Sequence, residues 1–223
     1  MPAAERNFDT PSTDVAPARR TQAERVAESD TRMLQAAMRL VASRGYAQTT
    51  LEAIGLEAGY SRGLVSHRFG SKDKMLEELV NRVIEDFRAG LLQRLRGLSG
   101  LDALFCEIDC YLEGMDDPPL ASRVFFVLMH ESIGPAPQIR EHFVRFGKRW
   151  QASLTRTVCK GQQAGSIRND VSAAEEARLL IATLRGLRTQ SMLDPAGSHI
   201  ARDIAALKSA LQQRLSPTPP ALP

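Results

Sequence analysis

The residue types best suited to reading a polyanion gather between Ser61 and Phe69. At helical spacing, Leu64, Val65 and Phe69 form an apolar stripe that would pack against the rest of a domain. The positions left facing outward are polar or small: Arg62, Gly63, Ser66, His67 and Arg68. An arginine can donate two hydrogen bonds to O6 and N7 of guanine, and short polar side chains can reach a base edge or a phosphate. This segment is therefore predicted to be a helix that reads the major groove of DNA.

A second short helix and a tight turn would position this reading helix. Residues 51–58 have helical spacing of apolar side chains, and Gly59 suits the turn that follows them. Ser61 can cap the next helix, and two helices that cross steeply through a glycine turn form a helix-turn-helix. At the start of the helix over residues 51–58, Thr50 is expected to cap the helix, to donate to a phosphate, or both. Tyr60 is a further candidate for a phosphate contact.

The composition is that of an ordinary globular protein. The 223 residues are 43% hydrophobic and 25% charged, which suffices for one sizeable core or for a small domain joined to a larger one. No apolar run approaches the roughly 20 residues needed to span a bilayer, and the N-terminus has no basic segment followed by an apolar one. We therefore expect a cytoplasmic protein with no membrane partner. Cys106 and Cys110 lie far in sequence from Cys159, so the three thiols are expected to stay reduced.

Positive charge is concentrated on the candidate DNA-reading region. The whole chain has a net charge of only +3. Residues 31–75 nevertheless hold seven basic and three acidic residues, whereas residues 76–223 hold eighteen and seventeen. A local excess of positive charge attracts phosphates and makes the affinity for DNA fall with salt concentration.

Helical periodicity recurs along the chain and no convincing strand is found, so an all-α fold of about nine helices is predicted. We divide the chain into a flexible N-terminal tail (1–28), a helix-turn-helix DNA-binding domain (29–75), a helical ligand-binding and dimerisation domain (76–215) and a flexible proline-rich tail (216–223). The first helix is expected over residues 31–44, and a long amphipathic helix from Ser71 links the two domains. Further helices are expected near 101–114, 119–132, 137–163, 173–193 and 199–215.

One region carries a spaced set of small, apolar and hydroxyl residues: Gly45-Tyr46, Thr49-Thr50, Ile54, Ala58-Gly59, Ser61-x-Gly63, Phe69 and Ser71-Lys72. This set resembles the N-terminal pattern of the tetracycline-repressor (TetR) family of bacterial regulators. The chain departs from that pattern at Gly55, where the family usually has alanine, and at Tyr60, Ser66 and Arg68. Because glycine in a helix interior costs about 0.5–1 kcal/mol relative to alanine, we expect a neighbouring backbone to pack closely against Gly55.

The resemblance implies a three-helix DNA-binding domain, a fourth connecting helix, and a homodimer formed through the last two long helices. It also implies that Lys72 contacts a phosphate. The run ARLLIATLRGLRTQSMLDP, residues 177–195, further resembles the C-terminal part of betaine-inhibitor-like (BetI-like) members. Apolar stripes on the last two helices supply the candidate dimer residues: Leu180, Leu184, Leu187, Ile204, Leu207 and Leu211.

Large apolar residues in the C-terminal part are numerous enough to line a cavity for a small-molecule effector. The candidates for ligand contact are Phe105, Phe125, Phe126, Met129, His130, Phe146 and Trp150. Core packing is the alternative for each of them, because an aromatic or methionine on a helix more often fills a core than a pocket.

Two chemical alternatives receive little weight. Gly59-x-Ser61-x-Gly63 satisfies the serine-hydrolase pattern and is followed by Asp194 and His199, but a nucleophile elbow needs a strand before the serine, and none is predicted. His130-Glu131 lacks a second histidine four residues after the first, because residue 134 is glycine, so no zinc-protease motif is complete. We therefore expect no enzyme activity, no metal and no cofactor.

These observations predict a ligand-responsive DNA-binding transcriptional regulator. The expected mode of action is a homodimer that represses by binding a palindromic double-stranded operator and is released by a small-molecule effector. A transcriptional activator and a ligand-independent DNA-binding protein are the alternatives. The predicted DNA-binding residues are Thr50, Tyr60, Ser61, Arg62, Gly63, Ser66, His67, Arg68 and Lys72.

Overall fold

The computed structural model describes residues 21–113 and 119–217, and every regular element in these ranges is helical. The elements are α1 (Gln22–Arg44), α2 (Leu51–Ala58), α3 (Arg62–Phe69), α4 (Lys72–Arg94), α5 (Gly100–Leu112), α6 (Leu120–Glu131), the 3-10 helix η1 (Pro137–Ile139), α7 (Arg140–Gln163), α8 (Ala173–Leu193) and α9 (Ile200–Leu215). The predicted all-α class is confirmed. Within the described ranges, no helix has the length and apolar character that a membrane span requires.

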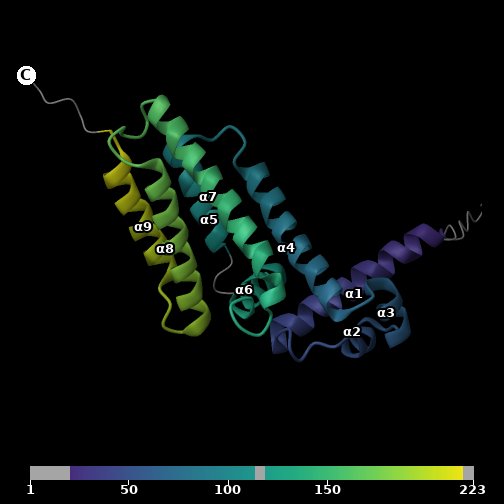
Figure 1. Ribbon diagram of the computed structural model, residues 1–223. Helices are drawn as coiled ribbons and strands as arrows, with labels where there is room; N and C mark the ends of the chain where they lie inside the picture. The colour runs from purple at the N-terminus through teal and green to yellow at the C-terminus, as the bar shows by residue number, and fades with distance from the viewer. Residues whose placement is uncertain (1–20, 114–118, 218–223) are drawn as a thin grey trace, which may run out of the picture.

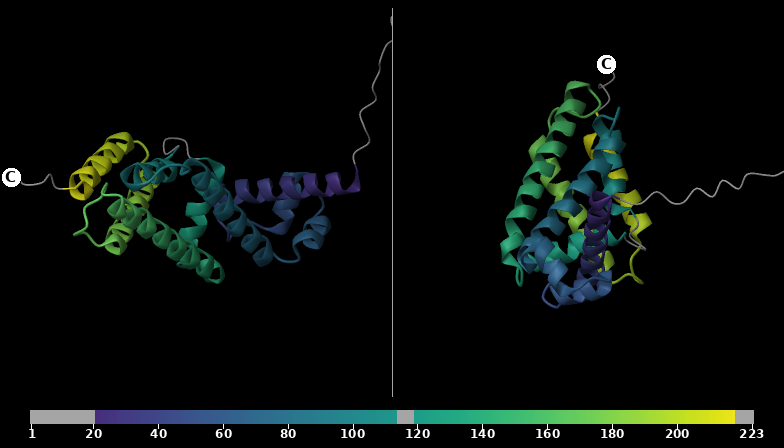
Figure 2. Two further views of the ribbon diagram at one scale, coloured as in Figure 1. Left: turned by 90° about the horizontal axis from the view of Figure 1, so that it is seen from above. Right: turned by 90° about the vertical axis from the view of Figure 1, so that its right-hand side faces the viewer.

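The helices form two parts joined by a long connector (Figure 1). Helices α1, α2 and α3 form a small head at one end, and α5 to α9 form a larger bundle at the other. Helix α4 begins in the head and runs into the bundle, while α6 packs against both α1 and α4. Seen from above, the molecule is elongated, with α3 and α9 near opposite ends (Figure 2). The head and the bundle therefore communicate through α4 and α6.

Hydroxyl caps set the starts of the helices in the head. The Thr50 hydroxyl oxygen accepts a hydrogen bond from the Ala53 amide at 3.0 Å, and Ser61 accepts from the Leu64 amide at 3.2 Å. Gly59 ends α2 in the left-handed conformation, with φ of 78°, which glycine adopts without a steric penalty. The helix-turn-helix predicted from these residues is present.

The first helix is longer than predicted. It begins at Gln22 rather than at residue 31, so residues 22–28, which we expected in a flexible tail, are helical. The signal that was missed is a capping box, in which Thr21 accepts from the Glu24 amide and the Glu24 carboxylate accepts from the Thr21 amide. This end of the helix is exposed and has no apolar stripe, so periodicity could not reveal it. Residues 1–20 lie outside the described ranges.

The bundle follows the predicted helices closely. Helix α8 has the predicted bounds, and the other predicted boundaries differ by a few residues. Helix α5 contacts α4, α7, α8 and α9, so it occupies the middle of the bundle. Its buried residues include Leu104, Glu107, Ile108 and Tyr111, which place one carboxyl and one phenol in the interior, where the buried Arg188 of α8 donates to the Tyr111 carbonyl oxygen at 2.6 Å.

Candidate DNA-reading surface and effector cavity

The reading helix α3 presents a mainly polar face with one apolar exception. Val65 and Phe69 are buried, whereas Arg62, Gly63 and His67 are exposed. Leu64 was predicted to pack inward but is 43% exposed, because Val65 and Phe69, one helical turn apart, already fill the inward side of this short helix. An exposed leucine can contact a thymine methyl group in the major groove. Leu64 is thus a candidate DNA contact that the periodicity concealed.

The hydroxyl groups that cap α2 and α3 can still donate a hydrogen bond to another group. Thr50 and Ser61 are both exposed, and each uses its hydroxyl oxygen to accept the capping hydrogen bond. A hydroxyl that accepts in this way can still donate its own proton. The geometry is therefore compatible with capping and a phosphate contact at the same residue. Tyr60 and Ser66 are half-buried beside this surface.

Arg68 occupies a different place from the one predicted. Its guanidinium is paired with Asp30 of α1 at 2.6 Å and with Glu78 of α4 at 2.7 Å, and it lies 4.7 Å from the ring centroid of Phe69. The hydrogen bonds that Arg68 donates to Glu78 and Asp30 raise its pKa further. Because its donors are directed to two carboxylates, Arg68 joins α3 to α1 and α4 rather than pointing freely outward.

Lys72 is also held within the head. Its Nζ donates to the carbonyl oxygen of Ala47 at 3.0 Å and lies 4.1 Å from the ring centroid of Tyr46. Burial lowers the pKa of Lys72, partly offset by the neighbouring charges of Asp73 and Glu131. The ammonium has three donors, so a phosphate contact at Lys72 stays a prediction.

A polar junction that sequence reasoning missed joins the head to α6 and η1. The Glu131 carboxylate accepts from the backbone amide of Tyr46 at 3.0 Å, and the Tyr46 hydroxyl donates to Asp73. Gln138 donates from Nε2 to the same Asp73 carboxylate at 2.9 Å. Burial and Asp73 raise the pKa of Tyr46 to about 12, and the hydrogen bond from Tyr46 lowers the pKa of Asp73. The partners lie up to 92 positions apart in sequence, so no local pattern could predict them.

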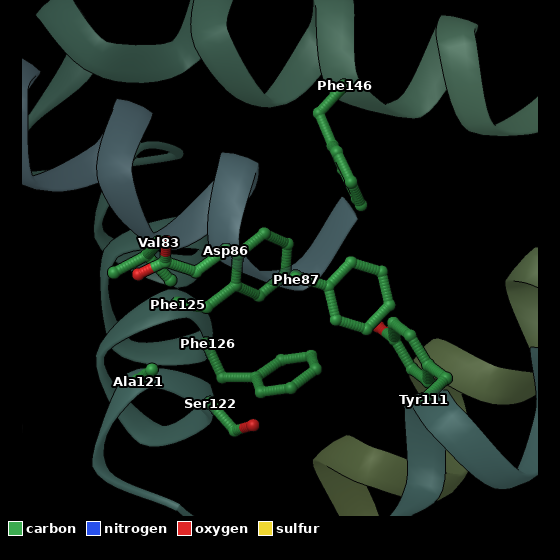
Figure 3. Close-up of a pocket in the computed structure, with 9 residues that line it drawn as sticks. All are labelled: Val83, Asp86, Phe87, Tyr111, Ala121, Ser122, Phe125, Phe126 and Phe146. Atoms are coloured by element: carbon green, nitrogen blue, oxygen red, sulfur yellow. The ribbon is translucent and has the colours of Figure 1, made fainter. Parts of the chain in front are cut away.

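An aromatic cavity of about 230 Å³ lies between α4, α5, α6 and α7. Figure 3 shows its rings facing a common space. The lining residues are Val83, Asp86, Phe87, Tyr111, Ala121, Ser122, Phe125, Phe126 and Phe146. Ring centroids lie close together, for example 5.3 Å between Phe125 and Phe146 and 6.0 Å between Phe87 and Phe146. An apolar cavity of 150 Å³ holds benzene, so this one suits a small organic molecule.

Polar groups at the cavity are few. The Tyr111 hydroxyl points toward Phe87 (Figure 3) and is buried without a hydrogen-bond partner in the described part of the chain. Burial raises the pKa of this phenol, although nearby Arg185 and Arg188 oppose the effect. Asp86 lines the exposed side and is paired with Arg82 at 2.9 Å. The cavity therefore combines aromatic walls with the hydroxyls of Tyr111 and Ser122 and one carboxylate, while the Arg188 guanidinium lies 5.1 Å from the ring centroid of Phe126.

A buried acid lies behind the ring of Tyr111. Trp150 stacks on Tyr111 with ring centroids 4.8 Å apart, and its Nε1 donates to Glu107 Oε2 at 2.9 Å. The other carboxyl oxygen of Glu107 is buried without a partner in the described ranges. Burial raises the pKa of Glu107 to about 7, and the hydrogen bond from Trp150 only partly offsets this.

The predicted ligand contacts are divided among several places. Phe125, Phe126 and Phe146 line the cavity, joined there by Phe87 and Tyr111, which were not among the predicted contacts. Met129 and His130 instead line an open groove between α6, α7 and α8. Trp150 lies outside the cavity lining, and Phe105 faces α9, where its ring centroid is 5.8 Å from Lys208 Nζ. Only three of the seven predicted residues are thus brought together.

The predicted dimer residues are also divided. Leu180, Leu184 and Leu211 are buried inside the protomer, because the same apolar stripes that predicted an interface pack within the bundle. Leu187, Ile204 and Leu207 are half-buried. The outer face of α8 instead exposes Leu179 and Leu193, which are 49% and 80% exposed. The exposed positions of α9 are mostly small: Ala201, Ala205, Ala206, Ser209 and Ala210.

The two chemical alternatives find no geometric support. Ser61 follows a helix and caps another, whereas Asp194 and His199 lie in the turn between α8 and α9, in the other part of the molecule (Figure 1). Within the described ranges, no three metal-ligating side chains come together. The Sγ atoms of Cys106 and Cys110 lie 4.0 Å apart as free thiols.

Two family models match most of the chain. Residues 33–79 match the model described as bacterial regulatory proteins, tetR family, and residues 108–216 match the model described as BetI-type transcriptional repressor, C-terminal. The first match contains α2 and α3, and the second contains most of the bundle. The predicted resemblance to BetI-like members is therefore confirmed over a longer segment than the run that suggested it.

Relatives with established names agree with these matches. The chain is 37% identical over 62 residues to the regulator BetI of Burkholderia ambifaria, which covers 28% of this chain and 32% of that protein. This alignment thus spans about a third of the relative's length. The regulator BetI 2 of Chromohalobacter salexigens is 26% identical over 188 residues, covering 82% of this chain and 87% of that protein.

Solved structures share the fold along nearly their full length. A transcriptional regulator from Saccharomonospora viridis, determined in complex with choline, is 24% identical with a TM-score of 0.76, covering 86% of this chain and 100% of that one. A TetR regulator from Chloroflexus aurantiacus is 22% identical with a TM-score of 0.78, covering 87% and 99%. The matched proteins are regulators of transcription rather than enzymes. With its helix-turn-helix head, its helical bundle and both family matches, the chain belongs to the TetR family of bacterial transcriptional regulators.

Proposed function

We propose that this protein is a dimeric repressor that binds a palindromic operator and is released when a small molecule enters the aromatic cavity. The observation that carries the proposal is the connection between the two sites. Helix α4 begins in the head and contributes Val83, Asp86 and Phe87 to the cavity. Helix α6 contributes Phe125 and Phe126 and ends near Glu131, which holds the Tyr46 amide of the head. A ligand that moves either helix would change the position of the head.

Two heads must engage DNA at a fixed separation. A dimer of helix-turn-helix proteins places its reading helices in successive major grooves roughly 34–36 Å apart. In our proposal Arg62 and Leu64 contact base edges, and the hydroxyls of Thr50 and Ser61 contact phosphates. A ligand can release the operator only if it binds the incompatible conformation more tightly, by several kcal/mol for a nearly complete switch.

We propose that the second copy packs on the outer faces of α8 and α9. Leu179 and Leu193 would be the apolar anchors, and the small residues of α9 would allow helices to approach closely. Leu179→Glu should produce monomers with weak operator affinity, as measured by sedimentation equilibrium and gel retardation. Leu92→Glu is the matched control, since Leu92 is similarly exposed on α4. An unchanged dimer mass for Leu179→Glu would move the interface elsewhere.

The cavity favours a compact cationic ligand. Five aromatic rings and the Asp86 carboxylate surround it, and a cation over such a ring gains about 0.5–2 kcal/mol. The choline complex of the Saccharomonospora viridis regulator is consistent with this class of ligand. We therefore propose a small quaternary ammonium compound, with choline as the first to test.

The operator test uses the full chain and fragments of its own chromosome. We expect footprints on a small number of palindromic sites, with affinity that falls steeply as salt rises. A footprint that the wild-type protein produces and the Arg62→Ala variant does not would support the assignment of α3 as the reading helix. Failure to retard any fragment at low ionic strength would refute the DNA-binding role. Transcription assays on the footprinted promoter then separate repression from activation.

The ligand test compares choline with 3,3-dimethyl-1-butanol, which has the same shape but no charge. We expect choline to bind by calorimetry at least several-fold more tightly and to release the operator, and Phe126→Ala to lose most of this preference. Equal binding of the two compounds would contradict the cationic class. Operator binding that no small molecule alters would favour the ligand-independent alternative.

A further inference from the structure

A second concave site lies outside the aromatic cavity. It is a groove of about 640 Å³ between the end of α6, the first half of α7 and the last half of α8. Its apolar walls include Phe143, Val144 and Ile133, the last of which is 72% exposed. No residue of the groove lines the aromatic cavity, but the groove borders the face of α8 proposed for the dimer, because Gly186 and Gln190 lie on the same side of that helix as Leu179 and Leu193.

The charge on the groove has one sign. Its lining contains Arg140, Lys148 and Arg185 and no carboxylate. Arg140 donates to the carbonyl oxygens of Ser132 and Ile133, both at 3.0 Å, so it is occupied by the end of α6. Neither Lys148 nor Arg185 forms an ion pair with another residue in the described ranges. Two positive groups thus face the groove without a protein counter-charge.

Arg185 is positioned for a ligand rather than for solvent alone. Its Nη2 lies 3.2 Å from where a Cβ on Gly147 would stand, so the guanidinium rests against α7 at a glycine. Its Nε is buried without a hydrogen-bond partner in the described part of the chain. The Arg185 side chain also lies close to the Tyr111 phenol, so a carboxylate in the groove would bind its terminal Nη donors rather than the buried Nε.

The groove is separate from the aromatic cavity but shares a wall with it. Phe143 lines the groove and Phe125 lines the cavity, with their ring centroids 5.4 Å apart. On the same wall, the charge of Arg185 acts on the phenol of Tyr111. Their linings have no residue in common and differ in charge, since the cavity has a carboxylate and the groove has only cations.

We propose that this groove is a second ligand site, specific for a small amphiphilic carboxylate. The acid group would lie between Arg185 and Lys148, and the apolar body would cover Phe143, Val144 and Ile133. A cationic ligand, which suits the aromatic cavity, is disfavoured here because it would meet like charges. The regulatory bundle would then accept two ligands of opposite charge at neighbouring sites.

The test titrates the full-length protein with octanoate, octan-1-ol and octylammonium, which share one chain length. We expect octanoate to bind at least tenfold more tightly than octanol, and octylammonium to bind most weakly. Arg185→Gln and Lys148→Gln should each weaken octanoate binding several-fold or more, whereas Arg149→Gln, an exposed arginine of α7 outside the groove, should not. Unchanged melting temperatures establish that the variants are folded.

Three outcomes would overturn the proposal. These are equal affinities of octanol and octanoate, octanoate binding by the two groove variants that matches the wild type, and dissociation of the dimer by either variant in sedimentation. The last result would assign the groove to a second copy of the chain. Choline titrations on Lys148→Gln keep this test separate from the proposed function, because Lys148 is not part of the aromatic lining and its substitution should leave choline binding unchanged.

Discussion

The head and the bundle obtain their candidate functional surfaces in different ways. In the head, the predicted DNA contacts lie between Thr50 and Lys72, and each capping hydrogen bond joins two residues three positions apart. In the bundle, the cavity gathers residues from Val83 to Phe146 on four helices. A local arrangement depends on the propensities of a short segment, whereas a dispersed one depends on how whole helices pack. The two parts should therefore respond to different kinds of substitution.

The largest expected effect concerns the buried acid of the bundle. Burial raises the pKa of Glu107 from 4.5 to about 7. The folded chain then holds this proton where the unfolded chain has released it, so stability should fall as pH rises from about 4.5 to about 7 and stay level above that. The difference corresponds to about 3 kcal/mol. Glu107→Gln should remove this dependence and be the more stable protein at pH 8, as measured by urea unfolding.

The head supplies the control for this pH series. Its operator affinity and local caps should be unaffected by Glu107→Gln when both proteins are folded. A wild-type stability that is flat between pH 5 and pH 7 would contradict the assignment, as would a variant that is less stable than the wild type at pH 8. Trp150→Phe should be destabilised at every pH, because it removes the donor that Glu107 Oε2 uses.

Gly55 tests the local packing of the head. A Cβ at this position would lie 2.7 Å from the Tyr60 carbonyl oxygen and 3.3 Å from the Arg62 amide nitrogen. Gly55→Ala should therefore displace the turn and cost about 2 kcal/mol despite alanine's better helix propensity. Operator binding should fall while choline binding in the bundle is retained. The measurements are thermal unfolding and calorimetry.

Gly90 provides the matched substitution for Gly55. It also lies inside a helix, α4, but a Cβ there would meet nothing within 4 Å. Gly90→Ala should be neutral or stabilising by about 0.5–1 kcal/mol. If both substitutions stabilise the protein, the close approach at Gly55 does not constrain the turn.

Sequence alone predicted the head better than the bundle sites, for a physical reason. Caps, the turn glycine and the close packing at Gly55 are encoded within a few residues of where they act. The exposure of Leu64 depends on which side of α3 packs inward, and the carboxylates that hold Arg68 come from two other helices, α1 and α4. Periodicity identified helix boundaries in the bundle, but an apolar stripe looks the same whether it meets its own chain or a partner, and Leu180 and Leu184, which it predicted at the interface, are buried within the protomer.

Arg62 and Arg68 offer a comparison of two arginines on one helix. Arg62 is exposed, whereas Arg68 is held by Asp30 and Glu78. Arg62→Gln should relax preference at one base pair of each half-site, by roughly 1–3 kcal/mol, with little change in melting temperature. Arg68→Gln should lower the melting temperature of the protein and weaken binding to all DNA sequences alike. Binding assays on operator variants would contradict this assignment if Arg68→Gln changed specificity and Arg62→Gln did not.

The smallest effect concerns the two roles of Thr50. Thr50→Ala should cost about 1 kcal/mol of stability, because the Ala53 amide loses its cap. Thr50→Asp retains a good cap acceptor but cannot donate to a phosphate, and it adds a charge that repels DNA. Thr50→Asn keeps both an acceptor and a donor. If the hydroxyl contacts a phosphate, aspartate should preserve the melting temperature and weaken DNA binding at all sequences, while asparagine should preserve both. If the Thr50→Asp and Thr50→Asn variants bind DNA equally well, the role of Thr50 is to cap the helix alone.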